Sequence, residues 1–479
     1  MNILMLTSET VPFSKSGGLA DVVGALSSSI QKTGDSVKVM MPMYGFINRK
    51  GFKKETLLKI KVLGGEETVQ ILVKKHRKVD YLAVDHPLFS ERNGIYGDTS
   101  FKPYSDNCYR FLLLSKAAIE YIKTSEWKCN ILHAHDWTAG PAMYLAKEAK
   151  LKVKTIFTIH NLAYQGDFSR FDILRSDFTP SEKMLSGTGL EKRFNMLKTG
   201  LEYADWITTV SPTYAKEICE AAQGCGLDPL LRSRSAVLSG ILNGIDNKEW
   251  NPAKDVFFTQ HFTARKQAPK AELKALAQKM FNLPCDPDKP IIGMISRLAE
   301  QKGFHELLDG DMSALERIAK EDKCQFIIIG TGDERFENKL RDIGARYENV
   351  STNIVFSAEL SHIVEGACDF FLMPSRYEPC GLNQMYSLVY GTLPIAHRTG
   401  GLADSIIDVG EDLIHGNGFL FSDLNADEIV KHVNRAIEFY HDKEHFSIAR
   451  TNALKCDFSW DESAKEYIKI YSQLLGGAR

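Results

Sequence analysis

The sequence lacks the features by which several classes of protein are recognised. Its nine cysteines are scattered, odd in number and never spaced C-x-x-C, which argues against a disulfide framework or a zinc ribbon and fits a reducing compartment. No run approaches the ~20 apolar residues that a membrane helix needs. The apolar start at 1–8 has neither the basic region nor the cleavage site of a signal peptide. We therefore expect a cytoplasmic protein with no membrane partner.

The charge and length of the chain narrow the choice further. A net charge of −2, without any block of like charges, gives no indication of a nucleic-acid partner. With 44% hydrophobic and 25% charged residues, the composition is that of an ordinary globular protein. At 479 residues the chain is too long for a single core, so we expect two or three domains.

Short β-rich runs alternate with helical patterns along the whole chain, which predicts an α/β fold with parallel sheets and crossover helices. A stretch at 51–84 is richer in strands and predicts a hairpin or meander insertion. The other predicted strands lie at 2–7, 36–40, 131–135, 154–160, 206–210, 291–296, 325–329, 354–356, 370–373 and 393–396.

Two boundaries divide the chain. A turn cluster at 243–246 predicts the end of a first domain, and a polar stretch follows it. Near the C-terminus, Ser459 and Glu462 have capping-box spacing and predict the start of a helix that carries Trp460, Tyr467 and Tyr471. This aromatic face must be buried, and one option is packing against the first domain. We therefore assign domains to 1–245 and 246–456, and a returning helix to 457–479.

Two heptapeptides far apart in the chain are nearly the same. The segments 15–21 and 398–404 both read basic, small hydroxyl, Gly-Gly-Leu-Ala-Asp, with five of seven positions identical. A diglycine that opens a helix lets backbone N–H groups approach an anion, and the helix dipole favours negative charge there. Tight packing alone would also explain one such turn. The second copy and the preceding Lys15 and Arg398 favour two anion- or sugar-facing helix starts.

A second motif follows the predicted strand at 291–295. Arg297 and Lys302 of S-R-L-A-E-Q-K-G lie at the carboxyl edge of the sheet, where open α/β folds bind ligands. A planar guanidinium and a point charge suit a diphosphate. The alternative is a solvated loop with surface charges.

The third motif, Y-E-P-C-G-L at 377–382, follows the predicted strand at 370–373. Glu378 precedes a proline and is therefore extended. Its carboxylate could accept bonds from sugar hydroxyls or oppose positive charge in a transition state. It could equally serve the N-terminal dipole of the next helix, and both roles can hold at once. The N–H groups of Gly381 and Leu382 begin that helix and are free to bind an acceptor.

Polar residues also end two strands of the first half. His133 and His135 lie on one face of a strand and suggest a metal site, but no further histidine and carboxylate pair completes one. Asp136 at the strand tip is the better candidate for substrate contact. His160 ends the next strand, so we expect it at the same sheet edge.

Together these segments closely resemble the bacterial glycogen synthases and plant starch synthases, glycosyltransferase family 5. The resemblance spans essentially the whole chain in order. It rests on K-[ST]-G-G-L-A-D at 15–21, H-x-H-D-W at 133–137, H-N at 160–161, L-N-G-I-D at 242–246, S-R-L-x-x-Q-K-G at 296–303, Y-E-P-C-G-L at 377–382 and R-T-G-G-L-A-D at 398–404. Two departures stand out. Ser16 replaces the more common threonine, and Tyr386 stands where a related group has a second glutamate.

The resemblance implies a GT-B architecture, in which two Rossmann-like domains flank a deep interdomain cleft and a C-terminal helix crosses back to the first domain. It implies that 1–245 holds the acceptor glucan and 246–456 the nucleotide-sugar donor. The reaction it implies is transfer of glucose from ADP-glucose to the non-reducing end of an α-1,4-glucan, with retention and without a metal cofactor. No residue is an obvious covalent nucleophile, so attack on the face of departure is favoured, with Asp136 the residue to suspect otherwise.

The resemblance also implies roles for single residues. Lys15, Arg297 and Lys302 would hold the diphosphate. His160 would bond the sugar near C6. Backbone groups of Gly18, Thr399 and Gly400 would assist at the diphosphate. Glu378 would contact the donor glucose together with main-chain groups of Cys380, Gly381 and Leu382. Asp21, Tyr96, Asp136 and Asn243 are further cleft candidates, Tyr96 from the weaker motif G-I-Y-G.

Three rival functions remain open. One is another retaining GT-B transferase with a different donor such as UDP-glucose, because base selectivity lies in loops that one sequence does not define. Another is a catalytically weak glucan-binding homologue. The third is a metal-dependent hydrolase built on His133 and His135.

Overall fold

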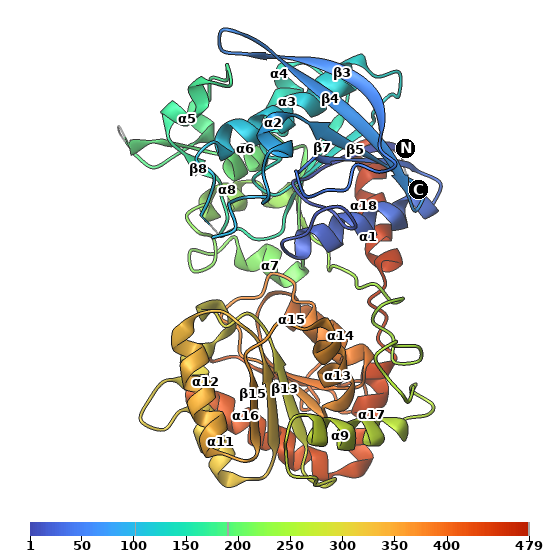
Figure 1. The fold of residues 1–479 in the computed structure, drawn as a ribbon, viewed down its shortest axis with the longest axis vertical. Helices are drawn as coiled ribbons and strands as arrows, with labels where there is room; N and C mark the ends of the chain where they lie inside the picture. Colours follow the sequence, from blue (N-terminus) through green and yellow to red (C-terminus); the bar gives the residue numbers. More distant parts are fainter. Residues whose placement is uncertain (101, 189–190, 478–479) are drawn as a thin grey trace. The chain divides into compact units, whose positions relative to one another are not determined.

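The chain folds into two compact α/β units (Figure 1). The computed structural model describes residues 1–100, 102–188 and 191–477, so the last two residues of the segment 457–479 lie outside the described residues. Unit 1 comprises Met1–Gly244 together with Trp460–Arg479, and unit 2 comprises Ile245–Ser459. The first division falls inside the turn cluster at 243–246, and the second directly precedes Trp460.

Unit 1 is built on a nine-stranded sheet with the order β12-β11-β7-β6-β1-β2-β5-β4-β3. Neighbouring strands from β12 to β5 are parallel, whereas β4 and β3 add an antiparallel arm at one edge. This arm and β5 are the strand-rich insertion that the sequence predicts. The strands are β1 (Asn2–Leu6), β2 (Ser36–Pro42), β3 (Lys53–Val62), β4 (Gly65–His76), β5 (Val79–Asp85), β6 (Ile131–His135), β7 (Lys154–Ile159), β11 (Trp206–Thr209) and β12 (Leu238–Gly240).

Helices and a small sheet complete unit 1. The helices are α1 (Gly18–Lys32), α2 (Pro87–Ser90), α3 (Asn107–Thr124), α4 (Pro141–Glu148), α5 (Arg170–Leu174), α6 (Met196–Tyr203), α7 (Pro212–Glu217), α8 (Asp228–Ser233) and α18 (Trp460–Leu474), with the 3-10 turns η1 (Glu182–Met184) and η3 (Ser235–Val237). The small antiparallel sheet has the order β8-β10-β9, formed by β8 (Asp167–Phe168), β10 (Arg193–Asn195) and β9 (Leu185–Ser186).

The C-terminal helix α18 belongs to the core of unit 1. It lies beside α1 (Figure 1), and its residues at positions three or four apart face the sheet. Trp460, Tyr467 and Tyr471 are buried among apolar side chains of α1, β1 and β2. The aromatic face of α18, for which the sequence alone defines no partner, is therefore buried against α1, β1 and β2 of the first domain.

Unit 2 is built on a six-stranded parallel sheet with the order β15-β14-β13-β16-β17-β18. The strands are β13 (Ile291–Ile295), β14 (Gln325–Ile329), β15 (Val350–Asn353), β16 (Phe370–Met373), β17 (Leu393–His397) and β18 (Phe419–Phe421). The helices are α9 (Pro269–Met280), α10 (Phe304–Leu308), α11 (Ala314–Glu321), α12 (Glu334–Arg346), α13 (Ala358–Ala367), α14 (Asn383–Val389), α15 (Gly400–Ser405), α16 (Ala426–His441) and α17 (Lys443–Leu454), with the 3-10 turn η4 (Glu300–Lys302).

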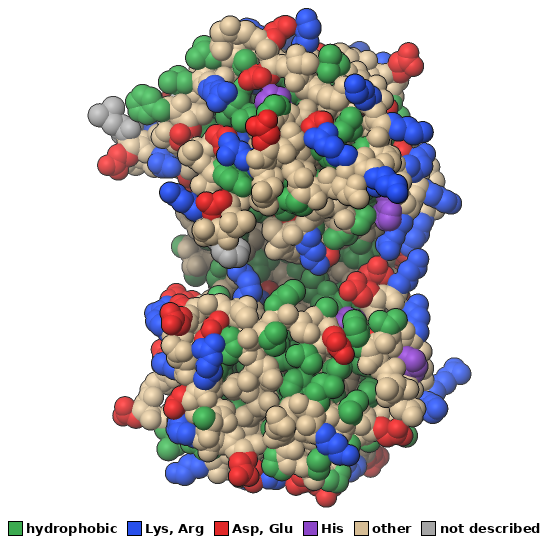
Figure 2. All heavy atoms as spheres, viewed as in Figure 1, with side chains coloured by type: hydrophobic (Ala, Val, Ile, Leu, Met, Phe, Trp, Pro, Cys, Tyr) green, Lys and Arg blue, Asp and Glu red, His purple; other side chains and the backbone are tan. Residues whose placement is uncertain are grey.

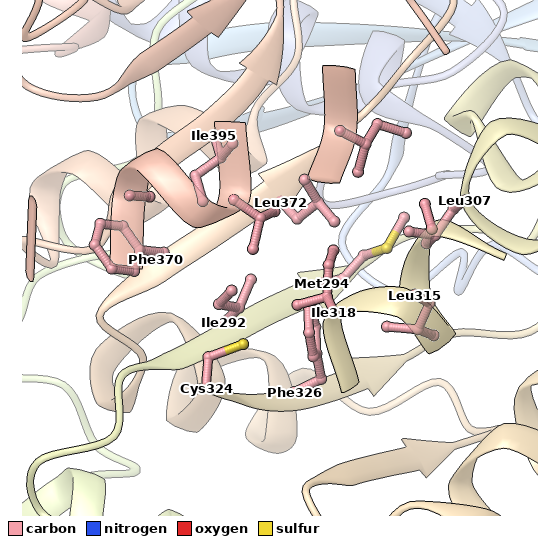
Figure 3. Close-up of a cluster of buried hydrophobic side chains, with 14 of the residues drawn as sticks. Ile292, Met294, Leu307, Leu315, Ile318, Cys324, Phe326, Phe370, Leu372 and Ile395 are labelled. Carbon is pink, nitrogen blue, oxygen red and sulfur yellow. The ribbon is translucent and has the colours of Figure 1, made fainter. Parts of the chain in front are cut away.

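Both faces of this sheet are covered by helices. Side chains of α10, α11, α12 and α16 pack on one face, and side chains of α9 and α13 pack on the other. Figure 3 shows the first of these layers, where Ile292 and Met294 of β13 meet Leu372 of β16. A parallel sheet buried on both faces explains why its strands read as continuous apolar runs in the sequence.

One predicted strand is wrong. The sequence predicts a strand at 354–356, but β15 ends at Asn353, and Phe356 is 92% exposed. The strand itself contains Ser351 and Thr352, since β15 is the edge strand of the sheet. The apolar run therefore marks the loop beyond the carboxyl end of the strand.

Charged side chains of both signs share the surface of the two units. Basic and acidic side chains are interspersed over the viewed face of each unit (Figure 2). Within the described ranges, no helix is long and apolar enough to cross a membrane. All nine cysteines are free thiols.

The parallel part of each sheet has one point at which the chain order reverses. In unit 1 this point lies between β1 and β6, and in unit 2 it lies between β13 and β16. Crossover helices leave in opposite directions there, so a crevice opens outside the carboxyl ends of the two strands. The motifs singled out in the sequence follow these strands, which directs attention to the two crevices.

Candidate active site

Unit 2 contains a cavity of about 200 Å³ at its switch point. It is lined by residues that follow β13 and β16 and by the start of α14. Five predicted site residues line it: Arg297, Lys302, Glu378, Gly381 and Leu382. The remaining lining residues are Met294, Ile295, Ser296, Leu372, Met373, Pro374, Ser375 and Asn383. Two motifs that lie about 80 residues apart in the sequence thus form one pocket.

The cavity contains a buried ion pair. Lys302 donates to Oε2 of Glu378, and the hydroxyl of Ser375 donates to the same oxygen at 3.1 Å. The two charged side chains are 19% and 9% exposed, so solvent screens the pair less than it screens an ion pair on the surface. Leu382, the N-cap of α14, has no side-chain capping bond. The Glu378 carboxylate accepts its hydrogen bonds from Lys302 and Ser375.

Arg297 is the second cation of the cavity. Its side chain is exposed, and among the described residues it has no hydrogen-bond or ion-pair partner. The Oγ of Ser296 next to it is buried and likewise without a partner in the described part of the chain. A free guanidinium beside an unsatisfied hydroxyl suits an anionic ligand with several oxygens.

The second heptapeptide supports the Glu378 loop from behind. Gly401 donates its N–H to the carbonyl of Glu378 at 3.1 Å. A Cβ on Gly400 would lie 2.0 Å from that carbonyl oxygen, and Gly400 has a φ of +43°. A Cβ on Gly401 would lie 2.0 Å from the carbonyl oxygen of Cys380. Close packing of Gly400 and Gly401 against Glu378–Cys380 requires this diglycine, so it acts on the site through the loop.

The first heptapeptide, in unit 1, is built differently. Gly17 is the N-cap of α1 and Gly18 its first residue. A Cβ at either position would meet nothing within 4 Å, and neither residue has a positive φ. The protein's own packing therefore does not require glycine here, which leaves open space above the N–H groups of the helix start. Lys15 and Asp21 flank this space and pair with each other at 2.8 Å.

Glu9 is a site residue that the sequence reasoning missed. It is 2% exposed and accepts bonds from the hydroxyl of Ser16 at 3.0 Å, the N–H of Gly17 at 3.3 Å and the hydroxyl of Tyr96 at 3.0 Å, as well as from the N–H of Ser16. Burial raises the pKa of its carboxyl. Its signal was an acidic residue three positions after β1, at the carboxyl edge of the sheet.

Tyr96 is held at this site by a buried clamp. Arg110, fully buried on α3, donates to the carbonyl of Ile95 at 3.0 Å and to Asn107 at 2.6 Å. Asn107 in turn donates to the carbonyl of Tyr96 at 2.8 Å. Two successive peptide groups are thereby fixed, which directs the Tyr96 hydroxyl toward Glu9.

Asp136 follows β6 in a left-handed conformation, with a φ of +57°. Its Oδ1 accepts the backbone N–H of His160 at 2.8 Å, which joins the tips of β6 and β7. Burial raises the pKa of Asp136 to about 7. A non-glycine residue held in this region of conformational space stores strain, and such residues cluster at functional sites.

The histidines near this edge have protein partners. Nδ1 of His133 lies 2.8 Å from the hydroxyl of Tyr471, and its Nε2 lies 2.6 Å from Oγ1 of Thr158. Nδ1 of His135 lies 3.1 Å from Nε2 of His160. Among the described residues no group of three or more histidines, cysteines or carboxylates could hold a metal ion.

Asn243 lies at the last turn of unit 1. Its side chain is buried, and its Oδ1 has no partner among the residues that the structure describes.

The predicted site residues divide between the two units. Unit 1 carries Lys15, Gly18, Asp21, Tyr96, Asp136, His160 and Asn243, and unit 2 carries Arg297, Lys302, Glu378, Cys380, Gly381, Leu382, Thr399 and Gly400.

Two Rossmann-like units, each with polar and basic residues at its switch point, match the domains that the resemblance to a GT-B glycosyltransferase implies. The starch synthase catalytic domain family matches residues 2–233, and the family of glycosyl transferases group 1 matches residues 277–455. A glycogen synthase from Treponema denticola is 38% identical over 99% of both chains, and one from Anaeromyxobacter sp. is 39% identical over 99% of both. The chain belongs to the glycogen and starch synthase family.

Solved structures agree with this assignment. The catalytic domain of starch synthase IV from Arabidopsis thaliana, bound to ADP and acarbose, superposes with a TM-score of 0.86 at 29% identity, over 99% of each chain. Sucrose-phosphate synthase from Thermosynechococcus elongatus has a TM-score of 0.61 at 15% identity over 99% of each chain, which shows a shared fold.

Proposed function

We propose that this glycosyltransferase moves glucose from ADP-glucose to the non-reducing end of an α-1,4-glucan, with retention of configuration and release of ADP. Relatives named glycogen synthase match the chain over its whole length, and the similar starch synthase structure holds ADP and acarbose. The observation that carries the proposal is the cavity of unit 2, in which the free Arg297 and the buried Lys302–Glu378 pair stand together.

In this proposal the cations of unit 2 serve the leaving group. Cleavage of the bond between the glucose C1 and the phosphate oxygen increases the negative charge on the diphosphate. Arg297 and Lys302 offset that charge. Lys15 and the backbone N–H groups at Gly18, in unit 1, contribute further positive charge. Thr399 and Gly400 keep the role of backbone contacts to the diphosphate, and Gly400 also packs against the Glu378 loop.

Glu378 is assigned to the donor sugar. When the diphosphate engages Lys302, the carboxylate becomes available to accept bonds from glucose hydroxyls and to oppose positive charge on the oxocarbenium-like sugar. Main-chain groups of Cys380, Gly381 and Leu382 are assigned to the same sugar. The buried setting of the Lys302–Glu378 pair supports this assignment, because electrostatic interactions are strong where water is scarce.

The acceptor is assigned to unit 1. The acceptor hydroxyl attacks C1 on the face from which the phosphate leaves, the C1–phosphate bond breaks, and the leaving phosphate oxygen takes the acceptor proton. His160 contacts the sugar near C6, and Asp21, Tyr96, Asp136 and Asn243 are further candidates for substrate contact in unit 1. No metal cofactor enters this scheme, since Arg297, Lys302 and Lys15 supply the positive charge. Full activity in the presence of EDTA is the expected result.

Phe356 is proposed to stack on the adenine. It lies three residues beyond β15, Arg297 lies two residues beyond β13, both at the carboxyl ends of parallel strands, and Phe356 is 92% exposed. Base stacking on an exposed aromatic face stabilises nucleotide binding without selecting the base. Phe356→Ala should therefore raise the KM for the nucleotide sugar and leave the turnover at saturation nearly unchanged.

The test is ADP or UDP release by the purified protein with glycogen present, at equal concentrations of ADP-glucose and UDP-glucose. Glycogen-dependent release that strongly favours ADP-glucose supports the proposal. Release from UDP-glucose alone would assign the protein to another branch of retaining GT-B transferases. Glycogen binding without release from either donor would favour a glucan-binding protein.

A further inference from the structure

We propose that His135 is a positioning residue that fixes the tautomer of His160, so that His160 presents an Nδ1–H donor to the sugar. The inference rests on the proposed function for the group that His160 contacts. The tautomer itself follows from the contacts of the two rings.

The two rings share one hydrogen bond. Nδ1 of His135 and Nε2 of His160 lie 3.1 Å apart, and the ring centroids lie 5.3 Å apart. Burial lowers the pKa of His160 to about 3 and that of His135 well below its usual value, so both rings are neutral at physiological pH. A neutral imidazole carries one N–H, so one ring donates here and the other accepts.

The far side of His135 decides which ring donates. Its Nε2 is buried, and no described residue bonds to it. If the proton were on Nε2, a buried N–H would be left without an acceptor, which proteins avoid more strictly than an unsatisfied acceptor. The proton therefore belongs on Nδ1 of His135, which donates to Nε2 of His160.

This assignment determines the state of His160. Because Nε2 of His160 accepts, its single proton must be on Nδ1. That nitrogen has no partner among the described residues, and the ring is only partly buried, so the N–H is available to a ligand oxygen. Substrate hydroxyls can accept from it, whereas the opposite tautomer would offer them only a lone pair.

The neighbours of His135 hold the ring in place. His133 lies against it with ring centroids 4.2 Å apart, and His133 is itself bonded to Tyr471 of α18 and to Thr158 of β7. His160 is fixed as well, because the Asp136 carboxylate accepts its backbone N–H. Both rings are fixed with the two nitrogens 3.1 Å apart, so what distinguishes the two tautomers is which nitrogen carries the shared proton.

The direct test is nuclear magnetic resonance of protein labelled with ¹⁵N-histidine, with signals assigned from His135→Asn and His160→Gln variants. The protonated and unprotonated ring nitrogens have well-separated shifts, so each tautomer is read without substrate. We expect protonated Nδ1 in both His135 and His160. A proton on Nε2 of His160 would overturn the inference, whatever donor the enzyme uses.

Two variants test the effect on catalysis. His135→Leu removes the donor, and we expect kcat to fall about 10- to 100-fold and the single His160 tautomer to be lost. His135→Asn places an amide N–H near the position of Nδ1 and should restore most of kcat together with the Nδ1–H signal. If kcat is unchanged in His135→Leu, the positioning role is wrong.

A matched control separates positioning from stability. Thr155→Val lies on β7, the strand that leads to His160, and removes buried hydrogen bonds to Asp205, but Thr155 bonds to neither His135 nor His160. It should lower the melting temperature without changing the His160 tautomer. If His135→Leu does not fold, the labelled wild-type protein and His135→Asn still decide the inference. Absence of transfer activity in the wild type would refute the proposed function, while the tautomer would still be measured.

Discussion

Lys302 and Glu378 form a buried ion pair across the two loops that frame the cavity of unit 2. Lys302 ends the turn η4 after β13, and Glu378 lies on the loop after β16. Any anionic ligand that binds Lys302 must compete with Glu378, and the carboxylate must then find other donors. Sugar hydroxyls are such donors, which links binding of a diphosphate to binding of the sugar attached to it.

Removal of either partner should abolish most turnover. We expect Lys302→Ala to lower kcat about 10²- to 10³-fold, since it removes charge stabilisation of the leaving group. Glu378→Gln keeps the shape but not the charge, and it should lower kcat similarly. Steady-state kinetics with ADP-glucose and glycogen measure both effects. The control is Arg376→Ala, because Arg376 lies on the same loop, pairs with Glu306 near the surface and does not line the cavity. Near-normal kcat in Lys302→Ala would refute its role.

The two diglycines should respond in opposite ways to alanine. A Cβ on Gly18 meets nothing, so Gly18→Ala should leave thermal stability unchanged or slightly higher while raising the KM for ADP-glucose. A Cβ on Gly401 would overlap the carbonyl of Cys380, so Gly401→Ala should cost about 1–3 kcal/mol of stability. Thermal unfolding and donor kinetics on the two variants give the comparison. A destabilised Gly18→Ala with normal KM would contradict the open anion site.

Asp136 should give the stability of unit 1 a specific pH dependence. Its pKa is about 7 in the folded protein, against about 3.9 in an unfolded chain. Its stabilising contribution is therefore full below about pH 4 and is lost as the pH rises through 7. Because asparagine does not titrate, Asp136→Asn should gain stability over the wild type by up to about 1.4 kcal/mol per pH unit across this range. Urea unfolding between pH 4 and pH 8 measures the difference. A difference that does not change with pH would be contrary to this expectation.

The C-terminal helix should be essential to unit 1. Trp460 is 6% exposed in the core of that unit, so Trp460→Ala should cost about 3–5 kcal/mol of unfolding free energy. Leu475→Ala is the control, because Leu475 is exposed just beyond α18 and should change stability by no more than about 0.5 kcal/mol. Denaturant unfolding compares the two, and equal effects would show that α18 contributes little.

The sequence alone determined much of the fold. The strands at 131–135, 325–329 and 370–373 match the structure residue for residue, since buried parallel strands are short apolar runs bounded by polar loops. The same rule failed at 354–356, where apolar side chains lie in an exposed loop after an edge strand. Local pattern reports the local balance of burial and polarity, and it cannot distinguish a buried apolar run from one left exposed.

For the site, the sequence identified the residue types and the motifs, and the tertiary structure decided what each one contacts. Both heptapeptides are visible in the sequence, but only the fold shows that one diglycine is open and that the other packs against the Glu378 loop. The fold brings Tyr96 within hydrogen-bond distance of Glu9. It also places His135, at the end of β6, beside His160, at the end of β7. A side chain's protonation and function depend on neighbours brought together by folding, and the spacing along the chain does not encode them.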